Sequence, residues 1–229
     1  MIEARGSPAA LVRAFDFYSH FYGRTAARLE REAVTRGLEK ACVRPEERVL
    51  EVAVGTAAAH ARLARRLGPR GQLVGIDLSS GMLAATRRRM PEARLVRADA
   101  RALPFPDDYF DLLWASYLLD LVPEEEMTPL LEGFRRVLKS GGRLLLVDFS
   151  KDCPGLTWWE RLYELTPSGL VPWLFAGCRP VHAEPFVRAA GFVEVERTFI
   201  AGGFHSEIIT ASKANHRGAE NAARAPRGE

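Results

Sequence analysis

Hydrophobic and polar residues alternate along this chain with two periods, one typical of strands and one of helices. Short aliphatic and β-branched runs predict buried strands at 49–54, 72–77, 94–98, 110–115 and 143–149. Apolar side chains at helical spacing predict helices at 57–67, 80–90 and 124–138. Parallel strands need connections long enough to return along the sheet, so this order predicts a mainly parallel sheet covered by helices on both faces.

Turn and cap signals mark the ends of these elements. Ser79 or Ser80 can cap the second helix, and the run 140–142 (Ser-Gly-Gly) predicts a turn before the strand at 143–149. After residue 150 an aromatic-rich segment leads to a predicted helix at 183–190 and a closing pair of strands at 192–200 and 204–211.

The two ends of the chain differ in apolar content. Leu11, Phe15, Tyr18, Phe21, Tyr22 and Leu29 recur at helical intervals near the N-terminus. This pattern predicts one or two helices docked on the domain. Residues 214–229 contain no apolar side chain larger than Ala, so they predict a disordered tail.

Composition and charge narrow the classes of function. The chain has 229 residues, 47% of them hydrophobic and 27% charged, which is typical of one globular domain with an appendage. A net charge of +3 gives no sign of nucleic-acid binding. Cys42, Cys153 and Cys178 show neither disulfide nor metal spacing, which favours a reducing, cytoplasmic location. The longest apolar runs are too short to span a bilayer, so we expect a soluble or at most peripheral protein.

Acidic residues follow the predicted strands and indicate a nucleoside ligand. Gly55 lies in a small-residue loop after the first strand, and Asp77 ends the second strand at the spacing that suits a carboxylate on ribose hydroxyls. Asp99 follows the third strand and can accept a hydrogen bond from an adenine amine. No phosphate-binding glycine motif is present, and Glu51 in the first strand favours a cation. The pattern therefore predicts adenosine with a positive charge and no phosphates.

Four segments, 49–56, 75–83, 98–105 and 136–144, together resemble class I S-adenosylmethionine (SAM)-dependent methyltransferases. The resemblance covers residues 45–150 and is closest to the ubiquinone/menaquinone-biosynthesis branch. It implies an α/β, doubly wound, seven-stranded and mostly parallel sheet whose last strand is antiparallel. It also implies an N-terminal helical lid at 1–44, a methyltransferase domain at 45–212 with an acceptor-side insertion at 151–182, and a disordered tail at 213–229.

The resemblance assigns SAM as cofactor and gives each motif residue a role. The implied cofactor-binding residues are Glu51, Gly55 and Thr56 around the methionine moiety, Asp77 on the ribose, Leu78 and Met82 beside the adenine, Asp99 and Ala100 at its edge, and Ser116 with Tyr117 near the sulfonium. Ala53 and Ala57 stand where the family usually has glycine. The extra methyl groups are tolerable if neither position needs a positive φ.

Structural interpretations remain open beside these roles. Asp77 and Asp99 can also cap helices, and Glu51 can also be a structural hydrogen-bonding group. Candidate catalytic residues are Tyr22 in the lid, with Tyr18 as its neighbour, Asp120 after the fourth strand, and His205 near the last turn; Arg179 is a further candidate for an anionic acceptor or an acid of the fold. Each of these residues can equally serve packing.

The predicted function is SAM-dependent transfer of a methyl group to a small, apolar or lipid-like acceptor, either a quinone-type ring carbon or an amine. The aromatic segment after residue 150 favours such an acceptor and leaves peripheral membrane contact open. An alternative is a SAM-binding regulatory or scaffold protein without turnover, which the alanines at 53 and 57 motivate. A nicotinamide dehydrogenase fits less well, because the dinucleotide glycines are absent.

Overall fold

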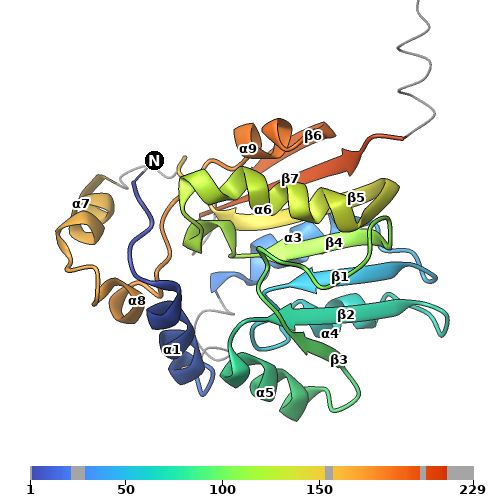
Figure 1. Ribbon diagram of the computed structural model, residues 1–229, viewed down its shortest axis with the longest axis horizontal. Coiled ribbons are helices and arrows are strands. Elements are labelled where there is room, and N and C mark those ends of the chain that lie inside the picture. The colour runs from blue at the N-terminus through green and yellow to red at the C-terminus, as the bar shows by residue number, and fades with distance from the viewer. Residues whose placement is uncertain (1, 22–28, 153–156, 202–204, 216–229) are drawn as a thin grey trace, which may run out of the picture.

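Strands that are far apart in the sequence form one twisted sheet with the order β3-β2-β1-β4-β5-β7-β6 (Figure 1). The computed structural model describes residues 2–21, 29–152, 157–201 and 205–215. The strands are β1 (Arg48–Val52), β2 (Gln72–Asp77), β3 (Arg94–Arg97), β4 (Phe110–Ser116), β5 (Leu138–Phe149), β6 (Phe192–Ile200) and β7 (Ser206–Lys213). Only β7 runs antiparallel to its neighbours within the described sheet. The predicted seven-stranded, doubly wound α/β fold is confirmed.

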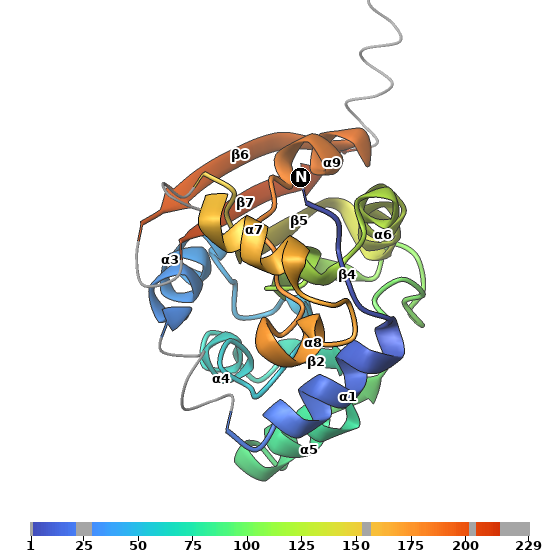
Figure 2. The ribbon, with the colours of Figure 1, turned by 90° about the vertical axis from the view of Figure 1, so that its left-hand side faces the viewer.

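Helices cover both faces of the sheet and one of its ends. They are α1 (Pro8–Tyr18), α3 (Arg31–Ala41), α4 (His60–Ala64), α5 (Ser80–Arg89), α6 (Glu124–Val137), α7 (Thr157–Leu165), α8 (Val171–Leu174) and α9 (Glu184–Ala189), with a 3₁₀ turn, η2 (Leu119–Leu121). α3 and α4 pack on one face, and α6 and α9 on the other. α1, α7 and α8 lie together at one end of the molecule (Figures 1 and 2). The cap formed by α1, α7 and α8 matters for the site below.

Alternation along the strands explains why the central ones read as continuous apolar runs. In β1, Leu50 and Val52 join the core under α6, whereas Val49 joins the core under α3. Leu113 and Trp114 of β4 divide between the two cores in the same way. Successive side chains point to opposite faces, and both faces here are buried under helices, so both sets must be apolar.

Several element ends depart from the sequence predictions, and three of the differences are informative. α4 begins at His60 rather than at residue 57, because Ala57 has a φ of 69° and cannot join a right-handed helix. β5 runs through the predicted turn at 140–142, where its pairing with β4 shifts register and Gly141 has a φ of 74°. The last strand is Ser206–Lys213, so it begins later than predicted.

Other predictions about the ends of the chain have different outcomes. The N-terminal pattern forms α1, which holds Leu11, Phe15 and Tyr18, whereas α3 begins after the last residue of the pattern. The prediction that Ser79 caps α5 is confirmed by its hydroxyl, which accepts a hydrogen bond from the Met82 N–H at 3.0 Å. The predicted tail falls largely at 216–229, outside the described residues. The boundaries of the lid, the domain and the insertion stay predictions. Across the described ranges, the helices are too short or too polar to cross a membrane.

Two helical glycines give a matched test of how tightly the sheet is packed. A Cβ on Gly37 of α3 would lie 2.9 Å from Trp114 and 3.0 Å from Val147, whereas one on Gly133 of α6 meets nothing within 4 Å. We expect Gly37→Ala to lower the free energy of unfolding by about 1–3 kcal/mol through overpacking. Gly133→Ala should raise it by about 0.5–1 kcal/mol through helix propensity. Urea unfolding of both variants measures the contrast, and a stabilised Gly37→Ala protein would contradict the packing.

Candidate functional site

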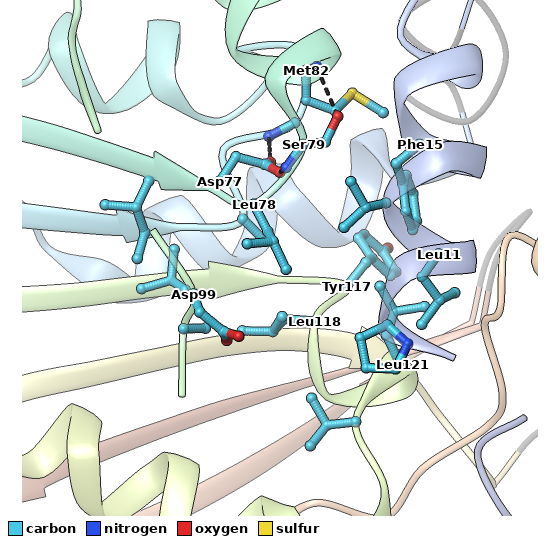
Figure 3. A pocket seen from close by; sticks show the side chains of 18 of the residues that line it. Leu11, Phe15, Asp77, Leu78, Ser79, Met82, Asp99, Tyr117, Leu118 and Leu121 are labelled. Carbon is cyan, nitrogen blue, oxygen red and sulfur yellow. Dashed lines mark hydrogen bonds between the residues drawn. The ribbon is translucent and has the colours of Figure 1, made fainter. Parts of the chain in front are cut away.

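A cavity of about 280 Å³ opens at the carboxyl ends of β1, β2 and β4 (Figure 3). Its walls come from the loops after these strands and after β3, and from the N-terminal segment on the opposite side. β1 and β4 are neighbours although β2 and β3 lie between them in the sequence, so the strand order reverses at this point. Ligands of open α/β sheets bind at such a switch point.

The carboxylate of Asp77 forms the centre of one end of the cavity. Its Oδ2 accepts a hydrogen bond from the Gly55 N–H and its Oδ1 accepts one from the Ser79 N–H, both at 2.9 Å. Burial raises the pKa of Asp77 to about 6, the two backbone hydrogen bonds oppose that rise, and the negative charge of Asp16 adds to it. Each carboxylate oxygen keeps a lone pair for a hydroxyl group of a ligand.

The loop after β1 is built from left-handed residues. Ala53, Gly55 and Ala57 have φ values of 59°, 55° and 69°. Both alanines therefore have a positive φ, the conformation in which a methyl group is unfavourable. Each costs the fold roughly 1–2 kcal/mol of strain relative to glycine. The loop reaches the geometry that presents the Gly55 N–H to Asp77 in spite of this cost.

Asp99 lies at the rim of the cavity and is tied to a guanidinium. Arg101 donates from Nη2 to Oδ2 of Asp99 at 2.8 Å and from Nη1 to Glu126 at 3.1 Å. The hydrogen bonds from Arg101 lower the pKa of Asp99, against the effect of burial. A ligand amine at this edge must share the carboxylate with Arg101.

Glu51 is buried but is not one of the residues that line this cavity. It shares a strand face with Val49, toward α4, and its Oε2 lies 2.6 Å from Nδ1 of the buried His60. Burial raises the pKa of Glu51, and the contact with His60 opposes that rise. This geometry favours the structural interpretation of Glu51.

The structure brings the other predicted cofactor residues together around the cavity. Those that line it are Gly55, Thr56, Asp77, Leu78, Met82, Asp99, Ala100 and Ser116. Among the described residues of the lining, Glu30, Asp77, Asp99 and Glu126 carry carboxyl groups and Arg101 is the one base. An acidic wall of this kind suits a cationic ligand and opposes phosphates.

The far end of the cavity is apolar and comes largely from residues that sequence reasoning did not assign to the site. Leu11, Val12 and Phe15 of α1 face Leu118 and Leu121 of the segment after β4 (Figure 3). Tyr117 lines the junction of the two ends, with a φ of 52° and its hydroxyl 2.9 Å from Ser206 Oγ. The helical spacing of Leu11 and Phe15 was visible in the sequence, but which surface they cover was not.

The candidate catalytic residues do not gather at this end. Tyr22 lies outside the described residues, and His205 packs beside Phe199 and is not part of the lining. Tyr18 is not part of it either, since its hydroxyl donates to the carbonyl of Pro172 at 3.3 Å. Asp120 is fully buried in η2 and is also absent from the lining.

Asp120 and Arg179 are two buried charged residues without full hydrogen bonding. Both carboxylate oxygens of Asp120 and two guanidinium nitrogens of Arg179 have no hydrogen-bond partner among the described residues. The backbone N–H of Arg179 donates to the carbonyl of Asp120 at 3.2 Å, which holds the two segments together. Burial raises the pKa of Asp120 to about 7.

Metal and disulfide chemistry find no support in the described part of the chain. No group of three or more His, Cys, Asp or Glu side chains is placed to hold a metal ion there. Cys42 and Cys178 are free thiols.

Comparisons with known proteins match this geometry. Residues 49–142 match the family model described as a methyltransferase domain. The ubiquinone/menaquinone biosynthesis C-methyltransferase of Teredinibacter turnerae is 37% identical over 141 residues, which are 59% of this chain and 55% of that protein. The chain thus spans about half the length of the curated relatives that it matches.

Solved structures share the fold at lower identity. A SAM-dependent methyltransferase from Aquifex aeolicus aligns with a TM-score of 0.60 and 18% identity, over 82% of this chain and 93% of that one. The cyclase SpnF aligns with a TM-score of 0.63 and 22% identity, over 80% of each chain. The fold is therefore that of class I methyltransferases, a fold that also carries a cyclase.

The strained loop predicts that glycine is better than alanine at one position. We expect Ala53→Gly to raise the free energy of unfolding by about 0.5–1 kcal/mol, because release of the left-handed strain exceeds the added entropy of the unfolded chain. Ala57 is buried, so the loss of its methyl group offsets much of the same gain. Denaturant unfolding tests this, with Ala58→Gly as control, since Ala58 has no positive φ. Equal destabilisation by both substitutions would contradict the strain.

Proposed function

We propose that this protein transfers the methyl group of SAM to a small apolar acceptor. Residues 49–142 match the model of a methyltransferase domain, and the chain shares the fold of a solved SAM-dependent methyltransferase. The observation that carries the proposal is the cavity at the switch point of the sheet. Its lining holds a carboxylate that accepts hydrogen bonds from backbone N–H groups, together with further acidic side chains. A quinone-type ring is the acceptor class that we favour.

The residues of the cavity fit SAM in charge and in shape. Asp77 would accept the ribose hydroxyls with the lone pairs that Gly55 and Ser79 leave available. Leu78 and Met82 would flank the adenine, with Asp99 and Ala100 at its edge. Gly55 and Thr56, with Ser116 across the cavity, would surround the methionine moiety. The excess of acids over bases in the lining supports a ligand with a sulfonium and an ammonium group.

Orientation and exclusion of water are what the chain itself contributes. Bound SAM would supply a methyl group already activated by its sulfonium. Leu11, Val12 and Phe15 would close the acceptor end from the side opposite the sheet. Holding the acceptor atom in line behind the methyl group can replace the entropy cost of a bimolecular encounter, with effective molarities on the order of 10⁵ M.

The acceptor class follows from the lining of the apolar end. Aliphatic and aromatic side chains dominate there, and none of the described side chains that line it is basic, which opposes an anionic acceptor and supports a neutral ring. The relatives carry the name of a ubiquinone/menaquinone C-methyltransferase, which agrees with a ring carbon as acceptor atom. An amine is the second candidate.

The location of the protein is also a proposal. The spacing of the cysteines supports the cytoplasm. Exposed apolar side chains on α7 and α8 support peripheral membrane contact, and they are Trp158, Leu162, Leu165, Trp173 and Leu174. A quinone-type acceptor with a lipid tail would be reached at such a surface.

Isotope transfer tests the reaction. We expect the protein, incubated with SAM labelled at the methyl group and with demethylated quinols, to place the label on a ring carbon, as read by mass spectrometry. Label on an amine of a metabolite and lipid extract would replace the ring by the second candidate. SAM binding with no labelled product from quinols or extract would contradict the proposal that the protein is a transferase. It would support the alternative of a SAM-binding scaffold, which the strained loop at Ala53 favours.

Affinity for SAM should depend on pH through Asp77. The pKa of this carboxyl in the free protein is about 6, and its ionised form accepts both ribose hydroxyls. Affinity should therefore be full above about pH 7 and fall up to about tenfold per pH unit below pH 6. Asp77→Asn should bind about tenfold or more weakly at pH 8 and lose this dependence. Calorimetry between pH 5 and 8 measures both, and unchanged affinity in the variant would remove the ribose assignment.

A further inference from the structure

One side chain connects the N-terminal helix to the cofactor end of the cavity. Oδ1 of Asp16 in α1 accepts a hydrogen bond from Ser79 Oγ at 2.6 Å and a second from the Gly81 N–H at 2.8 Å. Ser79 is the N-cap of α5 and donates its own backbone N–H to Asp77. Asp16, Ser79 and Asp77 thus form a continuous hydrogen-bonded chain from the helix to the candidate ribose site.

The same helix forms the wall of the cavity that does not belong to the sheet. Leu11, Val12 and Phe15 line the cavity, and Figure 3 shows Leu11 and Phe15 on the side opposite Leu78. Asp16 follows Phe15 directly, so its hydrogen bonds fix the end of the helix that lies nearest to α5. If α1 moves away, the cavity loses this wall.

Glycines at two contacts allow α1 to lie this close. A Cβ on Gly81 would lie 2.9 Å from both Cα and the carbonyl oxygen of Asp16, so any side chain there displaces the backbone of α1. A Cβ on Gly177 would meet Leu11 at 2.3 Å. At each of these two contacts, a side chain in place of the glycine would overlap with α1.

The far side of the N-terminal segment is held by independent hydrogen bonds. Tyr18 donates its hydroxyl to the carbonyl of Pro172 beside α8, and Arg5 donates from Nη1 to the carbonyl of Thr166 at 2.8 Å. These contacts join the N-terminal segment to α8 and to the residue that follows α7, and they do not involve α5. Asp16 is therefore the side chain through which α1 is joined by hydrogen bonds to the cofactor end in the described residues.

We infer that Asp16 is a positioning residue that holds α1, the wall of the cavity opposite the sheet, against the start of α5 and so slows the release of SAM. The inference rests on the proposed function for the identity of the ligand, but not for the contact itself. Two hydrogen bonds to a carboxylate at a helix N-terminus are of the strong, charge-assisted kind, and the dipole of α5 favours the negative charge.

Two variants disturb the contact between α1 and α5 in different ways. Asp16→Ala deletes the hydrogen-bond acceptor, whereas Gly81→Ala keeps the acceptor but places a methyl group against the backbone of α1. We expect each to speed hydrogen exchange of the α1 amides by about tenfold or more without ligand, and to speed SAM dissociation by a similar factor. Asp16→Asn keeps an oxygen that can accept from Ser79 and Gly81, so it should restore most of both values.

Gly133→Ala is the control, because it adds the same methyl group to a helix with nothing within 4 Å. It should change neither exchange in α1 nor SAM release. Faster SAM release from Asp16→Ala with unchanged exchange in α1 would overturn the inference, and so would an Asp16→Asn variant as defective as Asp16→Ala. If the wild-type protein binds no SAM, the proposed function fails, while exchange in α1 still decides the role of the Asp16 contact.

Discussion

The half-buried carboxylate of Asp77 is the constraint from which the geometry of the site follows. An anion partly removed from water is stabilised by hydrogen-bond donors, and here they come from the backbone of Gly55 on one side and Ser79 on the other. To present its N–H, the loop after β1 must turn back at once, which places Ala53 and Ala57 in the left-handed region. The strain of that loop, the cap of α5 and the position of α1 through Ser79 and Asp16 therefore depend on one charge.

Strand alternation separates Glu51 from Asp77, two acids that the sequence motifs both assign to the cofactor site. Glu51 lies three residues before the end of the first apolar run at 49–54, where the motif alone predicts that it lies beside the ligand. Because it shares a face with Val49, it points toward α4 and meets His60 instead. Gly75 makes room for this pair, since a Cβ there would lie 3.1 Å from the His60 ring. Of the two acids, Asp77 lines the cavity and Glu51 packs beneath α4.

The fold and the sheet side of the site could be predicted from the sequence because local patterns determine them. Apolar runs define the strands, Ser79 is a recognisable cap, and acids at strand ends converge on one edge in any parallel sheet. The cap side could not be predicted, because Leu11 and Phe15 reach the cavity through tertiary contacts between segments far apart in the chain. The start of α4 and the course of β5 through Gly141 were missed for a related reason, since a positive φ is a property of the folded loop and not of alanine or glycine alone.

Charge at the cavity wall bears on turnover as well as on binding. In the proposed reaction, methyl transfer removes the positive charge of the sulfonium, so a wall whose described residues include four acids and one base attracts the cofactor more strongly than the product at the reacting sulfur. The difference acts on the methionine end and leaves the ribose contacts to Asp77 unchanged. A site of this composition therefore favours exchange of product for fresh cofactor, provided that α1 can move away from the cavity. The hydrogen bonds of Asp16 determine how readily α1 moves.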